Sequence, residues 1–194
     1  MSVVEVASKL DANPHNTGIA TYTGRTFDVK RPGTWDFDIE DIARGLSSIC
    51  RFGGQVDFYS VAEHSIRVSE LLMERKWSPS VQLLGLLHDA AEAYIGDIPR
   101  PWKGEVMIGD MTYHEVEAII EANIFTQFGL WHDYVGEGWK AVKAADVDIY
   151  MVEAASRPTP SIMSADPRSM YRMFMWKFQT LSDAVRAESV EVGG

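Results

Sequence analysis

One stretch constrains this chain more than any other. At residues 83–103 the sequence LLGLLHDAAEAYIGDIPRPWK runs from an apolar segment directly into charged positions. These positions are His88, Asp89, Glu92 and Asp97. Charged side chains are seldom buried unless they pair with one another or bind a metal ion. We therefore expect this segment to carry part of a metal site as well as part of the hydrophobic core.

Length and composition predict a single domain with a core of its own. The chain has 194 residues, of which 46% are hydrophobic and 24% charged, as is usual for one globular unit. The net charge is -10, which argues against a nucleic-acid polymer or an anionic membrane surface as partner, because both need a basic face. The negative net charge does not exclude a small anionic substrate, because a metal ion or a few nearby cations can make the electrostatic potential inside a binding site positive.

Cysteine content and the N-terminal sequence bear on the compartment. The single cysteine, Cys50, has no partner for an internal disulfide, so a reducing cytoplasm is the expected location. The first residues, MSVVEVASKLDANPH, have no basic segment followed by a long apolar run, and no signal peptide is therefore expected. No apolar run approaches the length that spans a bilayer.

Hydrophobic periodicity predicts an all-α fold. Apolar residues recur at three- and four-residue steps along most of the chain. The segments expected to be helical are 36–50, 60–76, 79–94, 110–128 and 134–156, followed by a last amphipathic helix that carries Met170, Phe174, Phe178, Leu181 and Val185. Residues 1–34 are expected to form an N-terminal arm, in which TYTGRTFDV is either a short strand pair around Thr23-Gly24 or an extended segment. Residues 188–194 are expected to be a frayed tail.

Four side chains suggest a metal centre. On a continuous helix His88 and Glu92 would share a face, with Asp89 a third of a turn away. His64 lies on the apolar face of the preceding predicted helix, and Asp146 lies among small apolar residues in VKAADVDIY. Two imidazoles and two carboxylates would suit an octahedral ion such as Mn²⁺, Co²⁺, Mg²⁺ or Fe²⁺, with Zn²⁺ a further candidate.

Such a centre would leave two coordination positions open, for water and for a phosphoryl oxygen, and would hydrolyse a phosphate ester. Glu92 is placed to orient or deprotonate the water, and Asp97 could protonate the leaving oxygen. Taken singly, each of these residues is more often an ordinary core histidine or a surface acid. The hypothesis depends on their combination with His64 and Asp146.

The same motifs resemble a known family. VAEHS, LLHDAAE, GDIPRPWK and VKAAD are similar to successive motifs of the HD-domain phosphohydrolases, and the likeness extends from about Tyr22 to Glu153. Within this superfamily the chain looks most similar to bacterial 5′-deoxynucleotidases and to small phage-type HD enzymes, which include dATP triphosphohydrolases. The resemblance implies an HD-type helical bundle and homo-oligomers. It also implies metal ligation by His64, His88, Asp89 and Asp146, with Glu92 and Asp97 as the catalytic pair.

Substrate contacts are expected from Arg51, Phe52, Lys103 and Lys143. The deoxynucleotidases carry an Arg-Trp pair where this chain has Arg51-Phe52, so an aromatic ring is kept while the indole N–H donor is lost. Cations from three segments favour, by a small margin, a deoxynucleoside triphosphate that is split into deoxynucleoside and triphosphate. The alternative is a 5′-deoxynucleotidase that hydrolyses a deoxynucleoside monophosphate.

Two other classes remain open at this point. HD-type sites also hydrolyse cyclic nucleotides or alarmones, but those with two metals usually need extra histidines, and this chain has five in all. A helical binding module without catalysis is the third possibility, and it predicts nucleotide binding without turnover.

Overall fold

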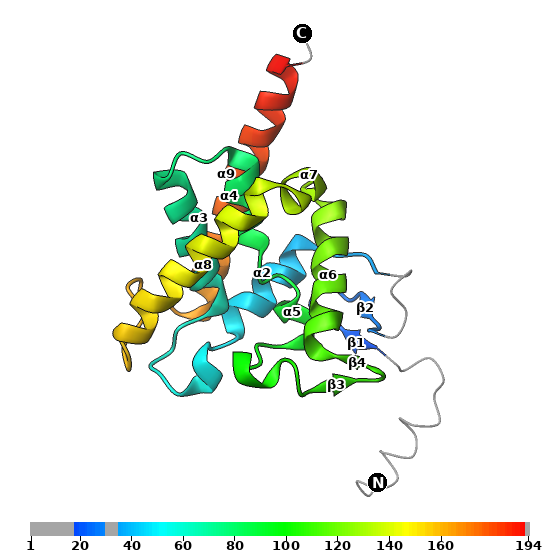
Figure 1. Ribbon diagram of the computed structural model, residues 1–194, viewed down its shortest axis with the longest axis vertical. Coiled ribbons are helices and arrows are strands. Elements are labelled where there is room, and N and C mark those ends of the chain that lie inside the picture. The colour runs from blue at the N-terminus through cyan, green and yellow to red at the C-terminus, as the bar shows by residue number, and fades with distance from the viewer. Residues whose placement is uncertain (1–17, 30–34, 193–194) are drawn as a thin grey trace, which may run out of the picture.

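The computed structural model describes residues 18–29 and 35–192, and helices dominate it (Figure 1). The α-helices are α2 (Ile39–Ser48), α3 (Val61–Glu74), α4 (Pro79–Leu87), α5 (Glu92–Ile95), α6 (Tyr113–Gln127), α7 (Trp131–Val135), α8 (Glu137–Ala155) and α9 (Pro167–Val192). Two 3-10 turns are η2 (Phe52–Gly54) and η3 (Arg100–Trp102). The strands are β1 (Ile19–Ala20), β2 (Thr26–Phe27), β3 (Met107–Ile108) and β4 (Met111–Thr112).

Local sequence explains where the principal helices begin. Ser60 accepts a hydrogen bond from the backbone N–H of Glu63 at 3.1 Å and thereby caps α3. Thr112 and Glu115 form a reciprocal capping box at the start of α6. Pro79 occupies the first turn of α4, where its missing N–H costs nothing. The predicted start of α3 is confirmed.

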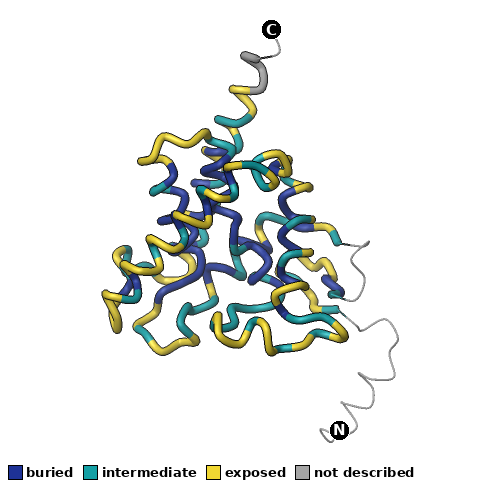
Figure 2. Tube along the Cα trace, viewed as in Figure 1, coloured by how far each residue is buried: buried dark blue, intermediate teal, exposed yellow. Residues whose placement is uncertain are grey.

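The core lies between α2, α3, α4, α8 and α9, which pack against one another. Figure 2 shows the buried segments gathered in the middle of the molecule, whereas the C-terminal end of α9 projects beyond the other helices. The largest fully buried side chains are Tyr59, Tyr113, Phe125, Phe174, Ile42, Leu46, Leu72, Leu84, Leu86, Leu87, Ile120 and Ile124. The prediction of one mainly helical, compact domain is confirmed.

Two glycines permit close helix contacts. A Cβ atom added to Gly45 in α2 would lie 2.7 Å from the Cβ and 2.8 Å from the Cα of Ala93 in α5. One added to Gly85 in α4 would lie 2.3 Å from the Cδ1 of Leu72 in α3. Both distances are far inside van der Waals contact. The small residue at position 45 therefore allows the short α5 to sit directly against α2.

The N-terminal residues that the structure describes form a strand pair rather than an extended arm. β1 and β2 are antiparallel, and Gly24 adopts a φ of +85° in the turn between them. The backbone N–H of Thr23 donates to Asp41 Oδ1 at 2.8 Å, and the ring of Phe27 lies 4.7 Å from that of Tyr94 in α5. Residues 1–17 and 30–34 of the predicted arm lie outside the described residues.

Several helix boundaries differ from the predicted ones. β4 of a second antiparallel pair, β3 with β4, occupies residues that were predicted to begin the 110–128 helix, and Gly109 supplies a positive φ for the tight turn between the two strands. The segment 134–156 begins instead with the separate short helix α7. Residues 188–192, expected to fray, continue the backbone of α9, and residues 193–194 lie outside the description. Within the described ranges, no helix is long and apolar enough to cross a bilayer.

Candidate metal centre

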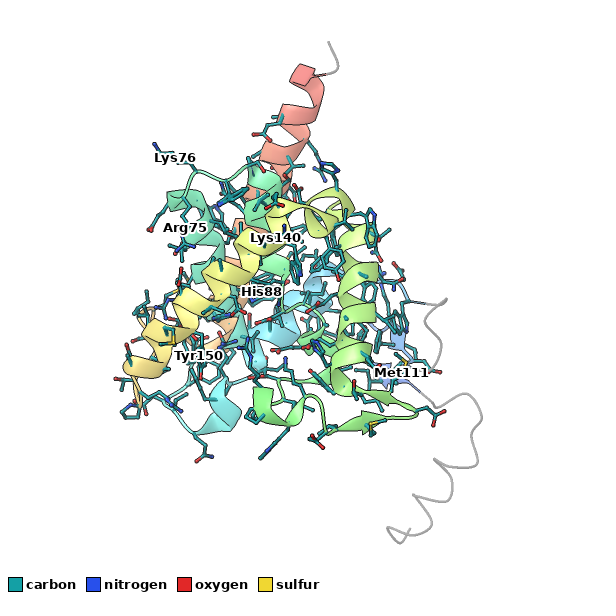
Figure 3. The ribbon with its side chains drawn as sticks, viewed as in Figure 1. Arg75, Lys76, His88, Met111, Lys140 and Tyr150 are labelled. Carbon is teal, nitrogen blue, oxygen red and sulfur yellow. The ribbon has the colours of Figure 1, made fainter. Side chains whose placement is uncertain are left out.

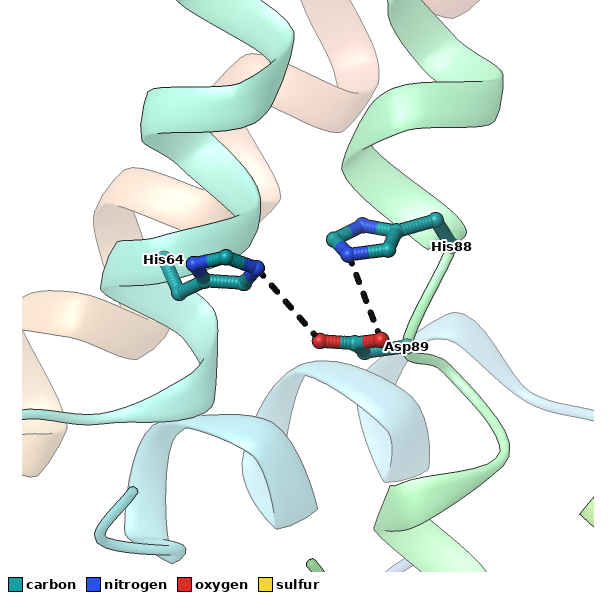
Figure 4. A group of neighbouring side chains, drawn as sticks. All are labelled: His64, His88 and Asp89. Carbon is teal, nitrogen blue, oxygen red and sulfur yellow. Dashed lines mark ion pairs between the residues drawn. The ribbon is translucent and has the colours of Figure 1, made fainter. Parts of the chain in front are cut away.

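Three segments that are distant in sequence bring the predicted ligands together. His64 lies in the first turn of α3, His88 and Asp89 follow the last residue of α4, and Asp146 lies on α8. Ligand atoms of His64, His88 and Asp89 all lie within 4.8 Å of one another, so this group could hold a metal ion (Figure 4). Asp146 joins them, because its Oδ1 is 3.1 Å from His64 Nε2 and 3.8 Å from His88 Nε2.

The segment that contains His88 is not one continuous helix. α4 ends at Leu87, a turn follows, and α5 begins at Glu92. The predicted continuous helix over residues 79–94 is therefore interrupted at residues 88–91, and His88 and Glu92 do not lie on one helix. In the turn, the N–H of Glu92 donates to the carbonyl of Asp89 at 3.0 Å. The chain thus presents His88 and Asp89 side by side at the end of a buried helix.

Hydrogen bonds define which nitrogen of each imidazole carries a proton. His88 Nδ1 lies 2.8 Å from the carbonyl oxygen of Gly85, and a carbonyl can only accept, so Nδ1 donates. His64 Nδ1 lies 2.7 Å from Oε1 of Glu153, to which it donates in the same way. In a neutral His88 ring the lone pair is therefore on Nε2. His64 has a second carboxylate contact, from Nε2 to Asp146 Oδ1 at 3.1 Å, and the shorter contact to Glu153 favours the proton of a neutral ring on Nδ1. Both Nε2 atoms face the carboxylates of Asp89 and Asp146.

This arrangement needs a cation. Nε2 of His88 is buried, lies 3.2 Å from Oδ1 of Asp89, and forms no hydrogen bond with any described residue. A lone pair that faces carboxylate oxygens is repelled unless a proton or a metal ion lies between them. Figure 3 places His88 near the middle of the molecule. The donor set of two imidazoles and two carboxylates fits a divalent ion.

The imidazoles and carboxylates of this group shift the pKa values of His88, Asp89 and Asp146. Burial lowers the pKa of His88, but Asp89 and then Asp146 outweigh it, so the pKa is raised. Burial opposes ionisation of Asp89, yet His88 and His64 lower its pKa to about 2. Burial likewise opposes ionisation of Asp146, yet the two imidazoles lower its pKa. A proton on His88 thus compensates charge that a metal ion would otherwise compensate.

Solvent reaches this centre from the carboxylate side. The side chains of His64 and His88 are 0% exposed, whereas those of Asp89 and Asp146 are 14% exposed. The open side of the centre is therefore the side of the two carboxylates.

Glu92 and Asp97, predicted to be catalytic, lie in the electrostatic surroundings of Asp89. Glu92 is 3% exposed; its Oε1 accepts from Lys103 Nζ at 3.0 Å, while its Oε2 is buried without a hydrogen-bond partner among the described residues. Burial, followed by the charge of Asp89, raises its pKa well above the ordinary value. Burial also raises the pKa of Asp97, although Arg51 and Lys103 oppose this effect.

Arg51 and Phe52, two of the expected substrate contacts, are already engaged. Arg51 places Nη1 3.4 Å from Asp89 Oδ2 and Nη2 3.4 Å from Glu153 Oε2. The ring of Phe52 stacks on that of Tyr150 at 6.1 Å. Phe52 has a φ of +58°, a conformation that residues other than glycine seldom adopt. Such strain is commonest at functional sites.

The two expected lysine contacts differ from each other. Lys103 is held between Glu92 and Glu117, with Nζ 3.0 Å and 2.6 Å from their carboxylates. Lys143 is exposed, and its Nζ lies 4.4 Å from the ring centre of Trp139. The charge of Lys143 lowers the pKa of His88, which places this lysine near the centre.

Sequence reasoning missed Glu153, which is 0% exposed and binds His64. A signal for it was available. Glu153 follows Asp146 by seven residues, or two turns of α8, and so lies on the same helix face. The sequence shows an isolated acid in the apolar run MVEAA, which is the pattern that made Asp146 itself conspicuous.

Comparison with known proteins identifies relatives without assigning an activity. No family model matches the sequence. The uncharacterized protein YfdR of Escherichia coli is 39% identical over 113 residues, which cover 58% of each chain. An uncharacterized protein of Rhodobacter capsulatus is 37% identical over 139 residues, which cover 68% of this chain and 68% of the relative. The chain therefore belongs to the same family as the R. capsulatus protein.

Proposed function

We propose that this protein is a metal-dependent phosphohydrolase of the HD-domain superfamily, which cleaves deoxynucleotides at the 5′ α-phosphate. The observation that carries the proposal is the buried pair of imidazoles, His64 and His88, whose Nε2 lone pairs converge on Asp89 and Asp146. Two carboxylates and two imidazoles give an ion a residual charge near zero. An anionic phosphate can approach such a centre from the solvent side.

A divalent ion held by these four side chains would supply Lewis acidity toward a phosphoryl oxygen and would acidify water. The protein itself supplies the proton transfers. Glu92 offers one carboxylate oxygen that has no described hydrogen-bond partner, and in the proposed reaction this oxygen accepts a proton from the attacking water. Asp97, buried in part beside Arg51 and Lys103, delivers a proton to the 5′ oxygen of the leaving deoxynucleoside.

The cations around the centre bear on the kind of phosphate. Arg51, Lys103 and Lys143 come from three segments, which would suit a triphosphate, and a deoxynucleoside triphosphate (dATP among them) is the first candidate substrate. However, Arg51 and Lys103 are already paired with carboxylates, whereas Lys143 forms no ion pair with a described residue. This observation favours the second candidate, a 5′-deoxynucleotidase that acts on monophosphates.

Product analysis tests both candidates. Protein loaded with Mn²⁺ or Co²⁺ is incubated with the four deoxynucleoside monophosphates and triphosphates, and the products are separated. Release of triphosphate identifies the first activity, and release of inorganic phosphate from a monophosphate identifies the second. We expect Asp146→Asn to abolish turnover. Asp148→Asn is the matched control, because Asp148 lies two residues on and pairs with Arg75 at the surface.

Two outcomes would refute the proposal. One is the absence of any product with every metal tested. The other is a turnover that survives Asp146→Asn unchanged. Binding of nucleotides without turnover would instead support a binding module. Homo-oligomers, a cytoplasmic location and the identity of the metal remain predictions.

A further inference from the structure

We propose that Glu153 is a positioning residue, which holds the proton of His64 on Nδ1 and so keeps Nε2 free to bind the metal ion. The inference rests on the metal site of the proposed function and goes beyond its ligands. It starts from the contact between Oε1 of Glu153 and Nδ1 of His64, which is 2.7 Å long and wholly buried.

Helix α8 supplies both Asp146, a proposed metal ligand, and Glu153, which binds His64. Asp146 and Glu153 are two turns apart on α8, so both face α3, where His64 lies. His64 is consequently held from two directions, because Nε2 faces Asp146 Oδ1 at 3.1 Å while Nδ1 binds Glu153. The position and the rotation of the ring are both fixed by α8.

The carboxylate of Glu153 is itself held in place. The hydroxyl of Tyr59 donates a short hydrogen bond to Oε1, and Arg67 Nη1 in turn donates to that hydroxyl at 3.2 Å. Arg51 Nη2 lies 3.4 Å from Oε2. Two guanidinium groups therefore surround a carboxylate that has no contact with solvent, which keeps it ionised and an acceptor only.

Loss of this acceptor would change which nitrogen carries the proton. Without Glu153, the strongest acceptor within reach of the ring is Asp146 Oδ1, at 3.1 Å from Nε2. A proton on Nε2 would satisfy Asp146 but would occupy the lone pair that a metal ion needs. Carboxylates behind metal-binding histidines commonly change metal affinity by about 10- to 100-fold when they are replaced.

A neighbouring glutamate provides the contrast. Glu63 precedes His64 on α3 and is 1% exposed. Its carboxylate accepts from the hydroxyl of Ser161 at 2.7 Å and from the backbone N–H groups of Ile162 and Met163. The side chain of Glu63 therefore holds a loop and forms no hydrogen bond or ion pair with the four proposed ligands. It is equally buried, and it serves as the matched control.

The test measures Mn²⁺ affinity by calorimetry for the intact chain and for the variants Glu153→Gln and Glu63→Gln. We expect Glu153→Gln to weaken Mn²⁺ binding about tenfold or more, and Glu63→Gln to leave it within about twofold. Unfolding of each metal-free protein by urea is measured in parallel. Equal Mn²⁺ affinity in folded Glu153→Gln and in the unaltered protein would overturn the inference.

A second measurement needs no variant. The ¹⁵N chemical shifts of His64 in the Zn²⁺-loaded protein report which nitrogen binds the metal. We expect a protonated Nδ1 and a metal-bound Nε2. Coordination through Nδ1 would overturn the inference even if Glu153→Gln did not fold. The proposed hydrolysis is tested separately. A protein that binds Mn²⁺ as expected but releases no product would refute the proposed activity and leave the role of Glu153 intact.

Discussion

Replacement of Glu121 by glutamine should stabilise the metal-free protein at pH 8 and have little effect at pH 5. Glu121 lies on α6 and is 8% exposed. Burial raises its pKa from 4.5 to about 8; Lys143 lowers the pKa, whereas Glu117 and Asp89 add to the increase. The folded protein therefore keeps a proton that the unfolded chain releases near pH 4.5.

The sign and the size of the effect follow from linkage. Because the folded state binds more protons between pH 4.5 and 8, its stability falls as the pH rises through this window. Each pH unit in the window costs about 1.4 kcal/mol. Between pH 5 and pH 8 the loss attributable to Glu121 is therefore about 3 to 4 kcal/mol. A glutamine at this position has no proton to release.

Urea unfolding at pH 5 and pH 8, in the presence of a chelator, measures the effect. The free energies of unfolding of the unaltered protein and of Glu121→Gln should diverge by about 3 kcal/mol as the pH rises. Glu105→Gln is the control, because Glu105 is exposed in the turn before β3. Parallel pH profiles for the unaltered protein and Glu121→Gln would refute the reasoning.

The other predictions concern packing and metal binding. Gly45→Ala should lower the free energy of unfolding by about 1 to 3 kcal/mol, because the added methyl group meets the backbone of Ala93. Gly104→Ala, which adds a Cβ with nothing within 4 Å, should change it by less than about 0.5 kcal/mol in urea unfolding. Mn²⁺ at a hundred times its dissociation constant should stabilise the protein by about 2.7 kcal/mol. Thermal unfolding should show that Mn²⁺ no longer stabilises His88→Ala. If Mn²⁺ stabilised this variant as much as the unaltered protein, the ion would bind elsewhere.

The candidate metal centre was accessible to sequence reasoning because its proposed ligands break a strong local pattern. His64, His88 and Asp146 each interrupt an apolar helix face, and a polar residue there needs a partner. Periodicity shows which face is buried, and so it also shows which polar residues lie on it. It does not show which distant helices meet, and the convergence of α3 with α8 is a property of the folded chain.

The turn after α4 illustrates a different limit. Residues 88–95 contain no proline or glycine, so local sequence predicts an uninterrupted helix. Tertiary contacts decide otherwise, since Ala93 packs directly on Gly45 of α2. β3 and β4 were missed for the opposite reason. Their signal, a tight turn at Gly109-Asp110, was present in the sequence, but the residues from Asp110 onward were predicted to begin a helix.

Arg51 shows why contacts with a proposed substrate are harder to predict than candidate metal ligands. A metal ligand can be predicted from its own residue type. Whether an arginine or lysine is free to bind phosphate depends on the charged residues around it in the folded protein. Arg51 was expected to bind phosphate, yet it lies between Asp89 and Glu153, and the latter also holds His64. A phosphate that recruits Arg51 must compete with both carboxylates. Metal binding at Asp89 would weaken one of those competitors, so binding of the ion and of the phosphate should reinforce each other.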